Sequence, residues 1–328
     1  MPASWVTALV FAALAVVPLV GGDYWTGQLT LYVIYGLLAV SLSLVWGRAG
    51  ILCFGQAMFF GIGGYVMAAL TKGMADPWLP GWFANTYVAL AFAVALPAGF
   101  AAALGHFLFW GRGLAGPYLA IVTLAIAVIL ERLMSNWYAM GGYNGLLDVP
   151  PLDLGLFGGE LELWDPVATY YVVLAVVVAV ILALHRLLAS PFGVVLTAVK
   201  TNPERAAFFG YRVFGVKLAA FVLGAALAGL AGALFVAVDA FASPTLIGFG
   251  LSTEILIWTA LGGREMVLAA FLGALVVRFL EAYLSELLGD YWILALGLVF
   301  MVSVTLLPRG LIAAPLARLS ALRPRLRA

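Results

Sequence analysis

The chain has 328 residues, of which 65% are hydrophobic and 9% are charged, and its formal net charge is +1. In a soluble domain roughly a quarter of the residues are charged, so this composition excludes a soluble protein. It predicts an all-α, polytopic membrane protein. The single cysteine, Cys53, excludes an internal disulfide framework, and the charge balance gives no indication of a nucleic-acid partner. We expect neither a metal nor a cofactor.

Apolar runs predict about ten membrane-spanning helices, because a span needs roughly 20 mostly apolar residues. In chain order they are 5–20, 28–46, 51–70, 86–110, 115–133, 167–188, 216–238, 252–261, 266–283 and 291–307. The first run is short. The eighth is shorter still, and Gly262 and Gly263 separate it from the ninth, so it is either a tilted half-span or a re-entrant segment. The count therefore lies between eight and ten.

The basic residues predict the orientation of these spans. With ten spans and a cytoplasmic C-terminus, every Lys and Arg except Lys72, Arg132 and Arg278 lies on the cytoplasmic side. This is the asymmetry of the positive-inside rule, and it places both termini in the cytoplasm. Asp239 and the pair of Arg278 and Glu281 come near the ends of their predicted spans, which disfavours an ion-coupled carrier.

Two segments outside the spans have distinct compositions. The predicted outer loop, 134–166, contains GGYNG, adjacent prolines and several carboxylates, so we expect turns there rather than a helix. The C-terminal segment 312–328 is basic with interleaved leucines and is expected to be a cytoplasmic tail, either a topology anchor or a segment lying on anionic lipid. Residues 1–311 then form a single transmembrane domain.

Several spans carry polar or small residues with two interpretations each. The run 48–70 is rich in glycine, including Gly61 and Gly64, which predicts either close helix packing or a pore-lining, gating helix. Gln56, in the same run, either faces a pathway or bonds to a neighbouring helix. Glu254 follows Ser252 and Thr253, so it is either a first-turn acid that complements the helix dipole or a substrate contact.

The most polar cytoplasmic interruption is 198–215. Thr201 or Asn202 is suited to cap a short helix, Pro203 to occupy its first position, Glu204 to its first turn and Gly210 to its end. None of the lysines follows a glycine, so the chain has no phosphate-binding G-x-x-x-x-G-K-[ST] loop. We therefore expect no enzyme: if ATP drives the protein, another polypeptide hydrolyses it.

Five stretches in order resemble the permease subunits of ATP-binding-cassette importers for branched-chain amino acids, to which urea and short-chain amide permeases are related. They are LSLVWGRAGILCFGQAMFFGIGGY (42–65), GGYNGL (141–146), AVKTNPERAAFFGYRVFGVKLAAFVLGAALAGLAGALFV (198–236), STEILIWTALGG (252–263) and LPRGL (307–311). LSLVWG and the acidic loop also resemble urea permeases, so urea or a short amide is the alternative cargo. A stand-alone secondary carrier or channel is the rival from another class.

The resemblance implies a location in the bacterial inner membrane and a set of partners. These are a homologous second permease subunit, two cytoplasmic ATPase subunits and an extracytoplasmic substrate-binding protein. It further implies that 198–215 couples the ATPases to the spans, through Lys200, Asn202, Pro203, Glu204, Arg205 and Gly210. It adds Asn144, in GGYNGL, to the candidate pathway or gating residues Gln56, Gly61, Gly64 and Glu254.

Overall fold

The computed structural model describes residues 4–74, 85–155, 162–291 and 310–316, apart from 112, 113 and 115, together with a few residues between 292 and 309. The helices are α1 (Ser4–Val16), α2 (Pro18–Leu42), α3 (Gln56–Thr71), α4 (Thr86–Phe109), α5 (Pro117–Asn136), α6 (Pro166–Ala189), α7 (Pro191–Thr201), α8 (Pro203–Phe208), α9 (Val213–Asp239), α10 (Phe249–Gly262) and α11 (Val267–Leu288). No strand occurs within these ranges, so the predicted all-α class is confirmed there.

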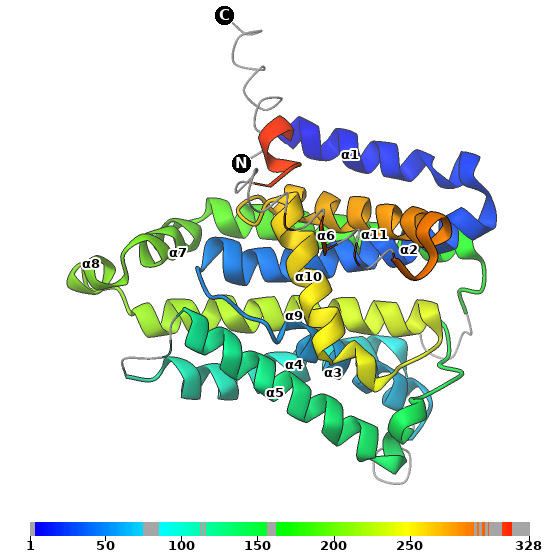
Figure 1. The fold of residues 1–328 in the computed structure, drawn as a ribbon, viewed down its shortest axis with the longest axis horizontal. Helices are drawn as coiled ribbons and strands as arrows, with labels where there is room; N and C mark the ends of the chain where they lie inside the picture. The colour runs from blue at the N-terminus through cyan, green and yellow to red at the C-terminus, as the bar shows by residue number, and fades with distance from the viewer. Residues whose placement is uncertain are drawn as a thin grey trace, which may run out of the picture.

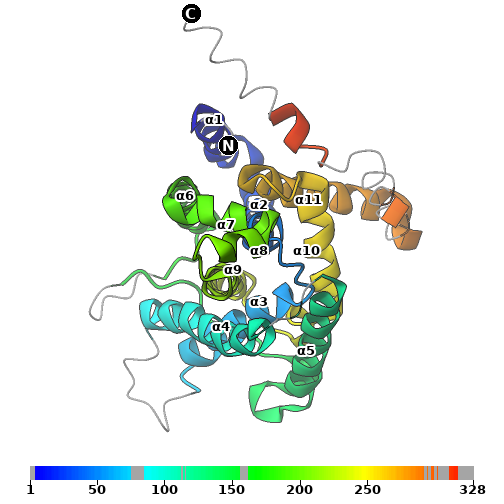
Figure 2. The same ribbon diagram turned by 90° about the vertical axis from the view of Figure 1, so that its left-hand side faces the viewer.

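Most long helices run along one direction, and α10 crosses them steeply (Figure 1). Viewed along that direction, α2, α3 and α9 lie at the centre, while α4, α5, α6 and α11 surround them (Figure 2). A π-helical turn, η1 (Ser43–Arg48), extends α2, and a kink at Gly22 separates its first residues from the rest. The core is therefore built on α2 and α9, whose spans are far more buried than those of α4 and α5.

Seven helical segments in the described part of the chain are long and apolar enough to cross a membrane. The helices α1 and α3 are apolar but shorter, and the predicted span 291–307 lies mostly outside the described residues. The segment 244–262 reaches spanning length because a 3₁₀ turn, η5 (Pro244–Leu246), precedes α10. The structure thus agrees with a multi-pass membrane protein and does not reach the predicted count of ten.

Close helix contacts explain the glycines of α3. A Cβ on Gly63 would lie 2.2 Å from the Gly229 carbonyl oxygen of α9, and one on Gly64 would lie 2.7 Å from Val236. A Cβ on Gly61 would lie 2.2 Å from Ile247. Small residues let helix backbones approach closely in a membrane, so the glycines bring α3 against α9 and η5.

Several predicted boundaries differ from the structure. Residues 51–55 are not helical, so α3 starts at Gln56, and α11 continues to Leu288, five residues beyond the predicted end. The predicted outer loop forms 3₁₀ turns η3 (Tyr138–Met140) and η4 (Gly142–Asn144) and otherwise irregular chain between α5 and α6 where it is described, as expected. At the start of the predicted tail, Ala313 and Leu316 are buried, and just before it the Leu311 N–H donates to the Leu261 carbonyl at 2.7 Å.

Candidate functional site

The helix α8 has the local structure that its sequence predicts. Asn202, rather than Thr201, is the N-cap, and its Oδ1 accepts a hydrogen bond from the Arg205 backbone N–H at 2.9 Å. Pro203 follows at the first position and Glu204 lies in the first turn. The chain leaves the helix through Gly210 at φ +86°, a left-handed conformation that favours glycine. These residues make a short, firmly bounded helix.

The helix α7, which precedes α8, was missed by sequence reasoning. It begins at Pro191 after Ser190, a Ser-Pro pair that is typical of a helix start and would have signalled it. Its buried face consists of Gly193, Leu196 and Val199. Only Asn202 separates α7 from α8. Together the two helices project beyond the ends of the long helices (left in Figure 1).

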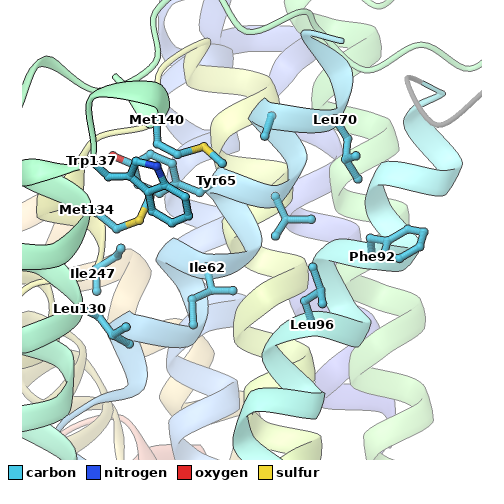
Figure 3. A pocket seen from close by; sticks show the side chains of 12 residues that line it. Ile62, Tyr65, Leu70, Phe92, Leu96, Leu130, Met134, Trp137, Met140 and Ile247 are labelled. Atoms are coloured by element: carbon cyan, nitrogen blue, oxygen red, sulfur yellow. The ribbon is translucent and has the colours of Figure 1, made fainter. Parts of the chain in front are cut away.

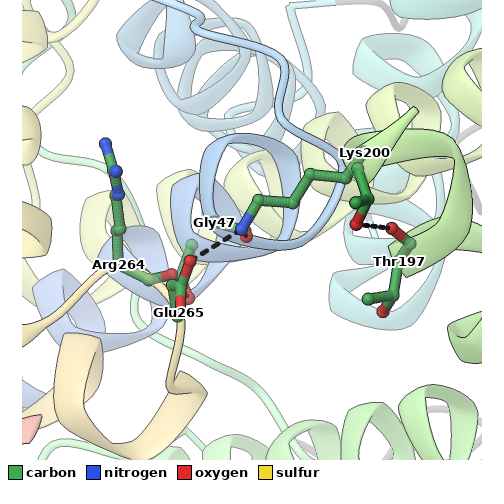
Figure 4. Close-up of polar contacts among 7 residues, drawn as sticks. Gly47, Thr197, Lys200, Arg264 and Glu265 are labelled. Atoms are coloured by element: carbon green, nitrogen blue, oxygen red, sulfur yellow. Dashed lines mark hydrogen bonds and ion pairs between the residues drawn. The ribbon is translucent and has the colours of Figure 1, made fainter. Parts of the chain in front are cut away.

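Lys200, at the end of α7, ties this projection to two membrane-spanning segments (Figure 4). Its ammonium group donates to the Gly47 carbonyl of η1 at 2.8 Å and to Glu265 Oε1, in the α10–α11 loop, at 2.8 Å. The hydrogen bond from Lys200 lowers the pKa of the Glu265 carboxyl. We call Lys200, Gly47 and Glu265 the latch.

The α10–α11 loop is itself fixed to η1. Ser43 Oγ donates to the Arg264 carbonyl at 2.9 Å, and a Cβ on Gly47 would lie only 1.7 Å from the same oxygen. A residue other than glycine at 47 would therefore displace the loop. The latch thus joins α7 to the junction of α2, α10 and α11.

The outer surface of α8 presents aromatic rings to its surroundings. Phe208 and Phe209 are 91% and 82% exposed, and Glu204 and Arg205 are exposed beside them. Behind them, a cavity of about 580 Å³ opens between α7, α8 and Arg48. Large exposed aromatics next to charges are typical of a protein-binding surface rather than of a solvated loop.

The remaining predicted site residues are not brought together. Gln56 is buried, and its amide donates to Ser41 Oγ at 2.9 Å and to the Gly224 carbonyl at 3.1 Å, which confirms the interpretation that it bonds to neighbouring helices. Gly61 and Gly64 serve helix packing, as described above. Asn144 is exposed in η4, and the chain that leaves the C-terminal end of α5 toward η4 lies at the opposite end of the molecule from α8 (Figure 1).

Glu254 is not the first-turn acid that one interpretation predicted. The helix α10 starts at Phe249, so Glu254 lies in its second turn and complements no helix end. The carboxylate of Glu131, on α5, instead lies against Gly248 at the N-terminus of α10, where a Cβ would be 2.5 Å from its Oε2. Glu254 faces Arg278 of α11, with 3.6 Å between Oε2 and Nη1.

Arg278 is far from the end of its helix, contrary to the prediction. It lies eleven residues after Val267 and ten before Leu288, hence at mid-length of α11. Its guanidinium pairs with Glu281 at 2.8 Å and lies 4.5 Å from the centroid of the Tyr35 ring. Sequence reasoning missed this cluster because the span was predicted to end at 283.

An apolar cavity of about 430 Å³ lies between α3, α4 and α5 (Figure 3). Ile62, Leu96, Leu130 and Met134 are among its lining residues. The Tyr65 hydroxyl, which also belongs to this lining, has no hydrogen-bond partner within the described residues. With almost no polar surface, the cavity suits hydrocarbon and offers no partner to an ionised group.

Comparisons with known proteins identify the family. The family model for the permease component of branched-chain amino acid transport systems matches residues 25–307. The chain is 32% identical over 306 residues to the high-affinity branched-chain amino acid transport system permease protein LivM of Escherichia coli (strain K12), covering 86% of this chain and 68% of that protein. It is 26% identical over 288 residues to the probable branched-chain amino acid transport permease protein LivH of Methanocaldococcus jannaschii, covering 84% and 87%. No solved structure matches it. The chain therefore belongs to the family of permease components of branched-chain amino acid transport systems.

Proposed function

We propose that this chain is one transmembrane subunit of an ATP-binding-cassette importer that moves branched-chain amino acids across a bacterial inner membrane. The observation that carries the proposal is the family match over residues 25–307, together with a capped, aromatic-tipped α8. A permease that lacks a nucleotide-binding motif needs a surface on which ATPases dock, and α8 supplies one. Lys200, Asn202, Pro203, Glu204, Arg205 and Gly210 then form the coupling element within 198–215.

The partners follow from this assignment. A homologous second permease completes the pathway, two ATPases bind the α8 end, and a substrate-binding protein delivers the amino acid at the opposite end, where Asn144 lies. We place the α8 end and both termini in the cytoplasm and propose about ten spans, with 1–311 as the permease domain and 312–328 as a basic tail that begins packed against α10.

Mechanical transmission is the role of the α7–α8 projection. When the ATPases close on ATP, they displace α8, and α7 passes the displacement through the latch to η1 and the α10–α11 loop. The pathway then changes its access from one side of the membrane to the other. A lone ion-driven carrier would have no use for this docking surface.

The test is purification of the complex through a tag on this chain, followed by reconstitution into vesicles. We expect ATPase subunits to co-purify and leucine uptake to require ATP. Competition between leucine and urea for uptake identifies the cargo, with leucine expected to compete. Uptake by the isolated chain, driven by an ion gradient without ATP, would overturn the proposal.

A further inference from the structure

Three ionisable side chains meet on α10 and α11, with Glu254 and Arg278 near the middle of these two candidate spans. Arg278 pairs with Glu281 at 2.8 Å and with Glu254 at 3.6 Å, and the side chains of Arg278 and Glu254 are 23% and 34% exposed. Two carboxylates face one guanidinium, so the cluster has an excess of one acid. The described residues contribute no further salt bridge to it.

An exposed charge at this depth is not compatible with contact to lipid. A single ionised side chain at the centre of a membrane costs about 2.5–3.5 kcal/mol on insertion scales. Such residues face a water-filled path or the interior of an assembly instead. The face of α10 and α11 that carries Glu254 therefore points away from hydrocarbon.

The two carboxylates are not equivalent. Glu281 lies one turn beyond Arg278 on the same helix, holds it at hydrogen-bond distance and is only 15% exposed. Glu254 comes from another helix, makes no hydrogen bond to Arg278 at 3.6 Å and is the more exposed of the two. Glu254 is thus the carboxylate that has room for a second cationic partner.

A cavity of about 410 Å³ lies between α2 and α11, and its α11 lining residues follow Arg278 toward the C-terminal end of that helix. Its lining combines five aromatic rings with two polar side chains: Tyr24, Trp25, Tyr32, Phe279, Tyr283, Gln28 and Glu286. Aromatic faces attract an ammonium group, and Phe279 adjoins Arg278 in the chain. The α11 lining of the cavity thus comes from the same stretch of helix as Arg278 and Glu281, and its aromatic rings suit an ammonium group.

We propose that Glu254 binds the α-ammonium group of an amino acid on its way through the membrane, with Arg278 facing the carboxylate of the same zwitterion. This inference rests on the proposed function, because it takes the cargo to be an amino acid. Urea is neutral and needs no such carboxylate. The aliphatic side chain of the cargo requires no charged partner, so one cluster serves leucine, isoleucine and valine.

The test probes the charge and the accessibility of the surface around Glu254 through a thiol placed beside it. Ile257 lies three residues after Glu254 on α10, on the neighbouring surface of the helix, and is partly exposed. We would introduce Ile257→Cys in a Cys53→Ser background, in the complete purified complex, with and without Glu254→Gln. The rates of modification by a cationic and by an anionic methanethiosulfonate are then compared, in the presence and absence of leucine.

We expect both reagents to reach the thiol and the cationic one to react faster. One unit charge at about 6 Å in water changes a rate about threefold, so Glu254→Gln lowers the cationic rate and raises the anionic rate by about that factor. Leucine slows the cationic reagent only where Glu254 is present. Three results would overturn the inference. Neither reagent modifies the thiol, Glu254→Gln leaves the ratio of cationic to anionic modification rates unchanged, or leucine leaves the cationic modification rate unchanged. ATP-driven leucine uptake by the unmodified complex is measured separately, so that the proposed function is tested independently of the role of Glu254.

Discussion

Lys200→Met removes the latch while keeping the length and the apolar stem of the side chain. The native ammonium group donates to the Gly47 carbonyl and to Glu265, both at 2.8 Å. A hydrogen bond from a charged donor contributes about 1.5–3 kcal/mol, and an exposed ion pair about 0.2–1 kcal/mol. Lys200 and Glu265 are 30% and 66% exposed. Solvent therefore screens the pair, and we discount the sum to about 1–2 kcal/mol.

This free energy changes the equilibrium constant of any step that depends on the latch by a factor of about five to thirty. We expect Lys200→Met to lower the ratio of leucine taken up to ATP hydrolysed by that factor in vesicles, while ATP hydrolysis itself continues. Glu265→Gln removes the ion pair and leaves the bond to Gly47, so it should lower the ratio by less than about fivefold.

Lys72→Met is the matched control for this experiment. Lys72 also donates to a backbone carbonyl, that of Leu147, but it lies near η4 rather than near α8. Its loss should leave the ratio unchanged. An unchanged ratio in Lys200→Met, or an equal loss in Lys72→Met, would refute the assignment of the latch to coupling.

Three further predictions concern Gly210, Glu265 and Gly63. Gly210→Val forces a β-branched residue into a left-handed conformation, at a cost of about 1–2 kcal/mol. It should uncouple ATP hydrolysis from uptake without preventing membrane insertion. Gly210→Asn should stay coupled, because asparagine tolerates this conformation. The pKa of Glu265 is lowered by its hydrogen bond with Lys200, so the stability that this pair contributes is fully present above the unfolded pKa of about 4.3 and is lost as the pH falls through the folded value. Coupling should therefore fall below about pH 4 in the native chain but not in Glu265→Gln. Gly63→Ala places a Cβ 2.2 Å from the Gly229 oxygen and should lower the melting temperature of the complex, unlike Gly99→Ala, where a Cβ meets nothing within 4 Å.

Features that depend on a few neighbouring residues could be predicted from the sequence. The boundaries of α8 follow from Asn202, Pro203 and Gly210, each of which acts within one helical turn. Helix packing through the α3 glycines was one of two predicted interpretations, and Gly63 against Gly229 shows why it holds. The all-α class follows from composition alone.

Features that depend on distant residues could not be predicted. The span containing Arg278 was predicted to end at 283, yet the helix continues to Leu288 and places Arg278 at mid-length. Its partners Tyr35 and Glu254 come from other helices. The latch joins Lys200 to Gly47, 153 residues earlier. The acceptor is a backbone carbonyl, which every residue has, so no residue type in the sequence indicates it.

The latch and the charged cluster share one structural unit. Glu254 and Arg278 lie on α10 and α11, and the loop between these helices carries Glu265. The two helices are in backbone contact at glycines, since a Cβ on Gly262 would lie 2.2 Å from the Ala269 oxygen. Arg278 is thirteen residues beyond Glu265, which is roughly 20 Å along a helix. Under the proposed coupling, a displacement of α7 that pulls on Glu265 would therefore move both sides of the proposed ammonium site together, and α8 would act on the cargo through the α10–α11 pair as well as through η1 and α2.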